Sequence, residues 1–317
     1  MWEDQEINNI VNTLKTNRRI KNFRSSLLPK FVFICGKQIL DENGKILPDQ
    51  ELVDNIRYYI LQQLEKQHEQ LDYGKDVKIA NCVLSEELYN QDLAEDILSF
   101  EELLAEISDC IIIVAESPGT YCELGAFVLN NKFMKKTIVI NEDNPDYKNS
   151  FITRGPVKKV KDNDPERVIL HNGLGRIKIS TEFNEKIKII AREKVEIEPI
   201  QKDAELDVKF LIYEFANIVE IFQPIEGYEI QEIFKKIFEI DKYDIRNKRQ
   251  NKINSMKKVI ELMEAMKLVN KVNGMYYLNK AFSFYNVIAT INRKEFNELR
   301  LRYLSRVYKL EPKRLEK

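Results

Sequence analysis

One short segment combines the residue types and the spacing that sugar chemistry needs. It runs Glu116-Ser-Pro-Gly-Thr-Tyr-Cys-Glu123-Leu-Gly-Ala-Phe and follows the most apolar stretch of the chain, residues 110–115. A carboxylate held at a ligand cleft can act as the nucleophile on the anomeric carbon of a sugar, and Glu123 is the candidate for that role. Free amide groups at the start of the helix that this segment opens would favour an anion or sugar hydroxyls nearby.

The same segment has an alternative interpretation in which Glu123 is only structural. Thr120 and Glu123 have the Thr-x-x-Glu spacing of a capping box, which satisfies backbone amides at the start of a helix. Spacing alone leaves the two interpretations equal. Gly119 allows the backbone to approach a ligand closely, and either Ser117 or Thr120 can cap the helix. We count these three residues among the candidates for substrate binding.

Four further residues are candidates for substrate binding. Gly36 ends a predicted strand, and Glu86 and Asp92 follow the next strand, where they could orient sugar hydroxyls. Arg154 lies in a Thr-Arg-Gly-Pro turn and could meet a phosphate. Each has an ordinary alternative, because protein surfaces commonly carry solvated acids and arginines.

Four short apolar stretches alternate with segments of helical periodicity. We predict strands at residues 31–35, 77–84, 110–115 and 136–140, since these runs are apolar and rich in residues that favour strands. Such strands separated by helices indicate a parallel sheet covered on both faces. We therefore predict a doubly wound, flavodoxin-like α/β domain over residues 31–200, after a helical lead-in over residues 1–30. In such sheets ligands bind at the carboxyl ends of the strands.

Residues 201–317 have a different pattern, in which helices precede a hairpin. We predict helices over residues 206–222, 230–240 and 251–269, then two short strands around Asn273-Gly274, a strong hairpin signal, and further helix over 281–317. Three helices followed by a hairpin is the order of a winged helix, whose third helix enters the major groove of DNA. Units of this kind also serve as docking surfaces for proteins, and that alternative stays open.

The net charge of −1 conceals a strong asymmetry along the chain. Residues 241–317 contain 19 Lys and Arg against 8 Asp and Glu, which leaves residues 1–240 with a net charge of −12. A solvated helical surface would explain this, but beside a predicted winged helix the asymmetry favours an anionic partner such as nucleic acid. The candidate nucleic-acid contacts are Arg246, Lys248, Arg249, Lys252, Lys257 and Lys258.

The composition excludes several classes of protein. Apolar residues make up 44% of the 317 residues, which is too many for a disordered chain, and Gly and Pro are too few for a collagen-like one. No apolar run approaches the ~20 residues of a membrane helix, and the polar start has no signal-peptide pattern. The four cysteines form no Cys-x-x-Cys pair, so we expect reduced, mostly buried thiols in a cytoplasmic protein, with Cys122 among the buried ones.

The segment around Glu123 resembles the nucleoside 2-deoxyribosyltransferase superfamily, whose nucleophilic glutamate lies in a Glu-Leu-Gly motif. The chain is more similar still to the effector proteins of retron antiphage systems, which join a domain of that kind to a winged helix. The matching pieces recur in the same order and are Phe31–Gly36, Ser85–Tyr89, Asp109–Val114, Glu116–Gly119, Glu123–Phe127 and Ser150–Pro156. The loop departs from the Gly-Gly-x-Gly-Thr-x-x-Glu pattern of related phosphoribohydrolases, because a single glycine precedes Thr120.

The resemblance implies an N-glycosidase effector, a toxin whose nucleophile is Glu123. A reverse transcriptase and its multicopy single-stranded DNA would hold the effector in check, and its release would deplete a nucleotide, with NAD as the candidate. No cofactor is implied beyond that substrate. Oligomerisation is possible for such an effector, and no membrane is implied.

The supply of acidic groups bears on the leaving group. A purine needs a proton as it leaves, whereas nicotinamide leaves from a cationic pyridinium as a neutral molecule. The chain has two histidines, His68 and His171, and neither lies in a motif that would supply a general acid. We therefore favour a cationic leaving group and expect no metal site. The carboxyl groups that could still donate a proton are Glu86, Glu87, Asp92 and Glu116.

Two other classes of function stay open. The α/β domain could be a nucleotide sensor that binds without turnover and gates a DNA-binding module. Such a sensor would tolerate Gln at position 123 with a modest loss of binding, whereas a glycosidase would lose turnover. The chain could instead be a structural subunit of a ribonucleoprotein, which would bind a nucleic-acid complex stably and perform no small-molecule chemistry.

Overall fold

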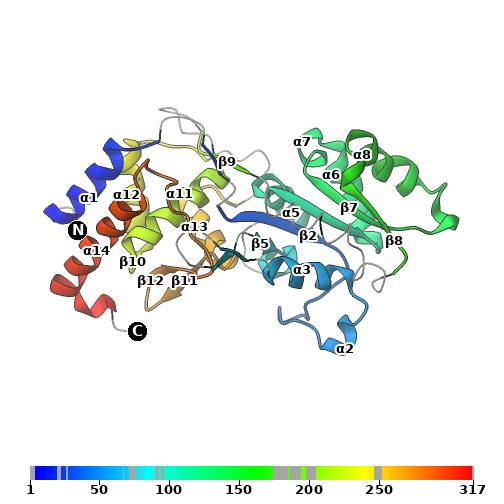
Figure 1. Cartoon of the computed structure of the whole chain (residues 1–317), viewed down its shortest axis with the longest axis horizontal. Helices are drawn as coiled ribbons and strands as arrows, with labels where there is room; N and C mark the ends of the chain where they lie inside the picture. The colour runs from blue at the N-terminus through cyan, green and yellow to red at the C-terminus, as the bar shows by residue number, and fades with distance from the viewer. Residues whose placement is uncertain are drawn as a thin grey trace. The chain divides into compact units, whose positions relative to one another are not determined.

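The chain folds into two compact units (Figure 1). The α/β unit comprises residues 29–90 and 96–193, and the helical unit comprises residues 1–28, 91–95 and 194–317. The structure, a computed structural model, describes residues 4–19, 23–25, 28–66, 68–70, 76–78, 80–89, 93, 96–173, 185, 194–197, 205–245 and 252–315. The N-terminal helix, which the sequence predicts as a separate lead-in, thus belongs to the same unit as the C-terminal helices.

The α/β unit is built on a five-stranded parallel sheet (Figure 1). Its strands are β2 (Lys30–Cys35), β5 (Ala80–Val83), β6 (Cys110–Ala115), β7 (Thr137–Glu142) and β8 (Val168–His171). Their spatial order is β5-β2-β6-β7-β8, so the first strand lies between the second and the third. The predicted α/β class is confirmed, and this order is compatible with the predicted flavodoxin-like fold.

Helices cover both faces of the sheet. Every residue of β2 and β6 is buried, and side chains alternate between the faces along a strand. On one face, Val32 and Ile34 of β2 belong to the same apolar core as Ile60 of α3 (Ile56–Lys66). The intervening Phe33 faces the other way, where its ring centroid lies 6.0 Å from that of Phe127 in α6 (Pro118–Leu129). Burial on both faces explains why these strands are apolar throughout.

The other helices of this unit whose bounds lie within the described residues are shorter than α6. They are α2 (Asp49–Leu52), α4 (Ser85–Tyr89), α5 (Ile97–Ile107), α7 (Asn131–Met134) and α8 (Lys158–Asn163), with single turns at Pro145–Tyr147, Thr153–Val157 and Pro165–Arg167.

One predicted strand of the α/β unit differs from the observed one. The prediction covered residues 77–84, but the strand in the sheet is β5 alone. The preceding β4 (Asp76–Lys78) pairs with β3 (His68–Gln70) in a separate antiparallel hairpin. The apolar pattern of residues 77–84 does not show that β4 and β5 are two strands that belong to different sheets.

A single helix, α11 (Val208–Phe222), forms the core of the helical unit. All its residues except Lys209 are buried. It packs against α12 (Gly227–Phe238), α13 (Met256–Ala265) and α14 (Arg293–Leu310).

The first helix of the chain completes the helical unit. α1 (Gln5–Thr16) packs against α12 and α14. An ion pair of 2.6 Å between Arg306 Nε and Asp4 Oδ2 joins α14 to the residue that caps α1. The unit is therefore assembled from segments at opposite ends of the sequence.

The helical unit also contains a small antiparallel sheet, which combines the hairpin that the Asn-Gly signal predicts with a short strand between α11 and α12. Its strands are β10 (Ile225–Glu226), β11 (Val269–Val272) and β12 (Met275–Leu278), in the order β10-β12-β11. Elsewhere in the unit, β1 (Phe23–Ser25) pairs with β9 (Val195–Ile197). The helix predicted over residues 281–317 is wrong in its first part, since α14 begins only at Arg293 and a 3-10 turn follows at Pro312–Leu315.

The turn between β11 and β12 depends on two left-handed residues. Asn273 has φ 51° and Gly274 has φ 82°. Replacing Gly274 by Ala should lower the free energy of unfolding by about 1 kcal/mol, because a Cβ disfavours this conformation. Asn273→Gly is the matched control and should keep or raise stability. Denaturant unfolding of the full chain measures both, and equal stability of the two variants would contradict the expectation.

Candidate active site

The candidate site lies where two neighbouring strands end. β2 and β6 run parallel and pair directly, so their carboxyl ends lie side by side. The chain leaves β2 towards β5 on one side, while β6 lies on the other, and the crevice between such diverging connections is where open α/β sheets bind ligands. Gly36 follows β2 at this point and Glu116 follows β6.

The start of α6 caps itself. Ser117 is the N-cap residue, and the backbone N–H of Thr120 donates to its Oγ at 3.4 Å. Thr120 Oγ1 in turn accepts from the backbone N–H of Ser117 at 3.1 Å and of Glu116 at 3.2 Å. Thr120 is 2% exposed, so its side chain serves the helix rather than an approaching molecule.

Glu123 takes no part in that cap. It is the sixth residue of α6, in the second helical turn, so the capping box that spacing suggested between Thr120 and Glu123 does not form. The box joins Ser117 and Thr120 instead. A Cβ at Gly119 would meet nothing within 4 Å, so this glycine leaves open space at the helix start.

The Glu123 carboxyl is partly withdrawn from water. Its Oε2 is buried and has no hydrogen-bond donor among the residues that the structure describes. Burial raises the pKa of Glu123, and the neighbouring Cys35 thiol and the charge of Arg57 only partly offset this effect. Such a carboxylate is poorly solvated, which keeps it reactive towards a carbon that develops positive charge.

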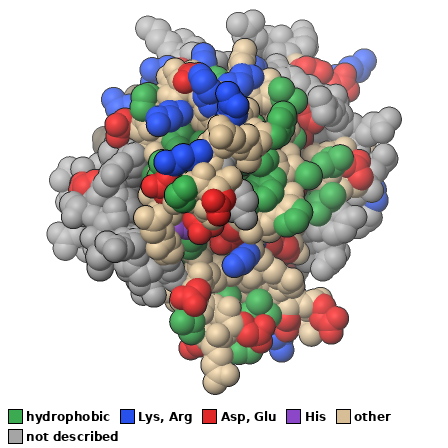
Figure 2. Space-filling model, turned by 90° about the vertical axis from the view of Figure 1, so that its right-hand side faces the viewer, with side chains coloured by type: hydrophobic (Ala, Val, Ile, Leu, Met, Phe, Trp, Pro, Cys, Tyr) green, Lys and Arg blue, Asp and Glu red, His purple; other side chains and the backbone are tan. Residues whose placement is uncertain are grey.

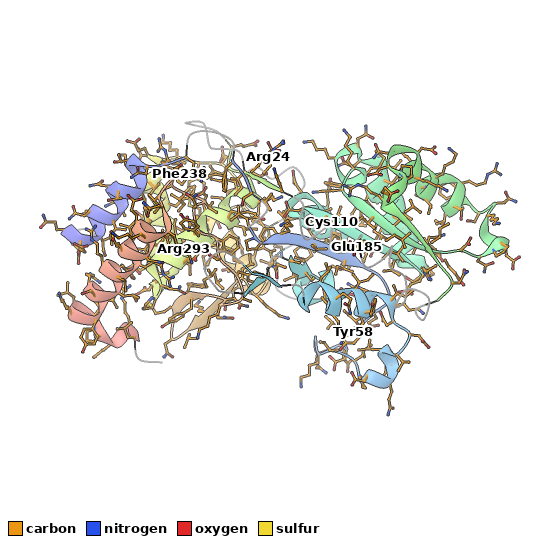
Figure 3. The ribbon with its side chains drawn as sticks, viewed as in Figure 1. Arg24, Tyr58, Cys110, Glu185, Phe238 and Arg293 are labelled. Carbon is orange, nitrogen blue, oxygen red and sulfur yellow. The ribbon has the colours of Figure 1, made fainter. Side chains whose placement is uncertain are left out.

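Arg57 is one of two residues of this site, with Glu101, that sequence reasoning missed. It lies in α3, is 1% exposed, and is adjacent to Tyr58, which is labelled in Figure 3. Its Nε donates to the carbonyl oxygen of Ile34 at 3.0 Å, and its Nη1 donates to that of Lys37 at 3.3 Å. Through these hydrogen bonds the guanidinium holds the backbone at the end of β2 and in the loop that follows it. A lone arginine on an otherwise ordinary amphipathic helix carries no sequence signal of this role.

Gly36 is required by the position of Arg57. A Cβ at residue 36 would lie 2.8 Å from Arg57 Cβ and 2.9 Å from its Cδ, closer than real side chains approach. The glycine therefore accommodates the arginine stem. Any contribution of Gly36 to a ligand would come from its backbone.

Glu86 is the charged partner of Arg57. Both its carboxylate oxygens accept from the guanidinium, with Nη2 to Oε2 at 2.8 Å. Burial alone would raise the pKa of Glu86, but the hydrogen bonds and charge of Arg57 outweigh it and lower the pKa. Glu86 is consequently ionised at neutral pH, and its side chain is still 36% exposed.

Two more carboxyl groups complete the surroundings. Glu116 Oε1 accepts the backbone N–H of Lys37 at 3.1 Å, and burial raises the pKa of Glu116. Glu101 of α5 is 7% exposed, and burial together with the charge of Glu123 raises its pKa to about 7. We call Glu86, Glu101, Glu116 and Glu123 the acidic cluster. In Figure 2, Asp and Glu side chains gather near the middle of the displayed face.

The other candidate residues of the α/β unit are not brought to this cluster. Arg154 is exposed in the turn Thr153–Val157, and none of its described contacts reaches the cluster. Asp92 lies outside the described residues. Cys122 is exposed, contrary to the expectation of a buried thiol, because it lies on the outer side of α6 while Leu124 faces the core.

The candidate nucleic-acid residues are described only in part. Arg246, Lys248 and Arg249 lie outside the described residues. Lys258 Nζ forms an ion pair of 2.8 Å with Glu261, whereas Lys257 Nζ lies 3.8 Å from the same carboxylate and its side chain is 79% exposed. The backbone N–H of Lys252 donates to the carbonyl oxygen of Leu93 at 3.2 Å.

Among the residues that the structure describes, no grouping of His, Cys, Asp and Glu side chains is suited to a metal ion. None of the described helices has the length and apolar character needed to cross a bilayer.

Comparison with known proteins identifies the family. A family model described as STM3845 retron effector protein matches residues 54–271, more than half of the chain. The chain belongs to the family of retron effector proteins. The matched range contains Arg57 and the whole acidic cluster. The resemblance to retron effectors drawn from the sequence is thereby confirmed.

Two Escherichia coli proteins are similar to this retron effector over most of their length. One, named "Retron Ec73 putative ribosyltransferase/DNA-binding protein", is 25% identical over 280 residues, which cover 80% of this chain and 79% of the relative. The other carries the same description for retron Ec86 and is 26% identical over 231 residues, 68% of this chain and 74% of the relative.

The close contact of Gly36 and Arg57 gives a stability test. Gly36→Ala should lower the free energy of unfolding by about 1–3 kcal/mol, because the added methyl group meets Arg57 in a packed environment. Gly119→Ala, at a glycine with open space, should show no loss. Chemical denaturation of both variants makes the comparison. A Gly36→Ala variant as stable as the wild type would show that Arg57 can move aside freely.

Proposed function

We propose that this retron effector is an N-glycosidase that cleaves the N-glycosidic bond of a nucleotide, with Glu123 as its nucleophile. One observation carries the proposal. A partly desolvated carboxyl, free of the helix cap, lies at the carboxyl end of the central strands, where ligands bind in such sheets. The printed names of the two relatives, which include ribosyltransferase, support chemistry at a ribosyl carbon.

The reaction needs two displacements at C1′ of the sugar. Glu123 bonds to C1′ as the bond from C1′ to the base breaks, and the bonding electron pair leaves with the base. Water then adds to C1′, the electron pair of the ester bond returns to Glu123, and a proton passes to solvent. Both steps develop positive charge on the sugar, which the neighbouring carboxylates of the acidic cluster would stabilise.

We propose NAD as the substrate. When the bond from C1′ to the nicotinamide nitrogen breaks, its electron pair goes to the cationic pyridinium ring. Nicotinamide therefore leaves as a neutral molecule, and no general acid is required. Among the described residues, two cations contact the acidic cluster of four carboxyl groups: Arg57 pairs with Glu86, and Lys37 pairs with Glu116. This excess of negative charge favours a cationic ring. Glu86 stays the proposed partner of ribose hydroxyls, with Ser117, Gly119 and Arg154 as proposed contacts for the rest of the nucleotide.

Replacing Glu123 by Gln tests the activity. Purified wild type and Glu123→Gln would be incubated with NAD and a panel of nucleosides and deoxynucleotides, with free base followed by chromatography. We expect the variant to lose at least about a thousandfold in the rate of base release, since the nucleophile is gone. Its melting temperature should not fall, because Glu123 holds no part of the helix cap.

Each outcome of that experiment has a definite meaning. Release by the wild type alone supports the glycosidase and names its substrate. Equal release by both proteins removes Glu123 from the mechanism. Absence of release from both, also when the retron reverse transcriptase and its multicopy single-stranded DNA are added, favours a nucleotide sensor.

We further propose that the helical unit docks on nucleic acid as a winged helix. The order α11-β10-α12-α13-β11-β12, with the sheet order β10-β12-β11, supports this interpretation, and so does "DNA-binding" in the names of both relatives. The proposed contacts are the basic residues that the sequence singled out around α13. The proposed partner is the multicopy single-stranded DNA with its reverse transcriptase.

Salt dependence tests this second proposal. Contacts to phosphates release counterions, so binding should weaken steeply between about 50 and 200 mM salt. Lys257→Gln should weaken binding and make the slope of log K against log salt smaller by about 1. Lys294→Gln, on α14 with a side chain 86% exposed, is the matched control and should change neither. Fluorescence anisotropy with a labelled single strand measures both, and binding that is flat with salt would contradict the proposal.

A further inference from the structure

Glu101 is a charged residue in a position that ordinarily holds an apolar one. It belongs to the face of α5 that is buried with Phe100 and Leu104, and it is 7% exposed. Removing a carboxylate from water costs free energy unless the group is paired or holds a proton. By contrast, Glu106 of the same helix is only half-buried.

Among the residues that the structure describes, no cation forms an ion pair with Glu101. Its carboxyl interacts with Glu123 on α6 and with the hydroxyl of Ser85 on α4. Within the described part of the chain, the other charged or titratable groups that face this pair of carboxyls are Cys35 from β2, Arg57 from α3 and Glu86 from α4. Arg57 is already engaged by both oxygens of Glu86.

Two carboxyl groups in one buried space cannot both ionise at low cost. One proton shared between them resolves the repulsion and supplies a hydrogen bond. Glu123 can accept that hydrogen bond, because its Oε2 is buried and no described residue donates a hydrogen bond to it while both carboxyls are ionised. Glu101, the more deeply buried of the two, is the partner on which the proton is best retained.

We propose that Glu101 and Glu123 share one proton, and that Glu101 is a positioning residue whose O–H donates to Oε2 of Glu123 and leaves Oε1 to attack the sugar. The second half of this statement rests on the proposed glycosidase function. The proton stays on Glu101 throughout. In the glycosyl ester, Oε2 is the carbonyl oxygen, and the same hydrogen bond stabilises the carboxylate that returns when water displaces Glu123 from C1′.

The proposal predicts a basic limb in the pH profile of kcat. As the pH rises through about 7, Glu101 loses its proton, Oε2 loses its donor, and the pair carries two negative charges. Glu101→Gln retains an N–H donor that does not titrate, so its kcat should lack this limb. Glu101→Leu has no donor, so its kcat should be lower by about tenfold or more at every pH. Glu106→Gln is the control on the same helix and should keep the wild-type profile.

A second measurement does not depend on turnover. The full-length protein would be labelled with carboxyl-¹³C glutamate, and the carboxyl resonances of wild type, Glu101→Gln and Glu123→Gln would be followed with pH. One resonance should titrate near pH 7 in the wild type and disappear in Glu101→Gln. In Glu123→Gln its midpoint should fall, because the neighbouring negative charge has been removed.

The outcomes separate the two proposals. A Glu101 midpoint that is the same in Glu123→Gln and in the wild type overturns the shared proton. A basic limb that persists in Glu101→Gln, with melting temperatures unchanged, overturns the positioning role. If no protein releases base while the two resonances remain coupled, the glycosidase function fails and the shared proton stands.

Discussion

The candidate site depends on one buried guanidinium. Arg57 reaches across the end of β2 and binds backbone carbonyl oxygens there, while Glu86 neutralises it from α4. Because a buried charge must be fully paired, this contact fixes the loop after β2 and the start of α4 in one arrangement. Gly36 follows from the same constraint, since a side chain there would occupy the space of Arg57.

The protonation of the carboxyl groups in the site depends on which of them pair with Arg57. Glu86 accepts from both terminal nitrogens of the guanidinium and is ionised, so Glu123 receives only the longer-range part of that charge, while the charged neighbours of Glu101 are carboxyl groups. The carboxyls of Glu123 and Glu101 are therefore harder to ionise than free ones, while Glu86 is easier. Three similar side chains thus acquire different protonation behaviour from their positions alone, as catalytic carboxyl groups commonly do.

The sequence predicts the scaffold better than the details of the site. The parallel strands are apolar on both faces, and Asn273-Gly274 marks the turn of the hairpin. Local sequence patterns are therefore enough to predict both elements. The roles of Arg57 and Glu101 cannot be predicted in this way, because each is one charged residue on an amphipathic helix, and its role arises only when a distant strand or helix comes beside it. The helix predicted from residue 281 fails for a similar reason.

The stretch between β12 and α14 illustrates that failure. Its backbone is held by buried polar groups of α11: Glu220 accepts from the N–H of Phe284 at 2.7 Å, and Asn217 accepts from that of Ile288 at 3.1 Å. These tertiary bonds replace the internal bonds of a helix. A local pattern of apolar residues contains no information about them, since the acceptors lie some 60 or more residues earlier in the chain.

Because the helical unit combines segments from both ends of the chain, it cannot be completed until translation is nearly finished. α1 packs against α12 and α14, yet α14 is made only after the α/β unit has left the ribosome. The α/β unit is nearly continuous in sequence and can fold as soon as residue 193 has emerged, whereas α1 must wait for its partners. The unit with the acidic cluster is therefore complete first. In the cell, each newly made chain passes through a period in which that unit is folded and the helical unit is not.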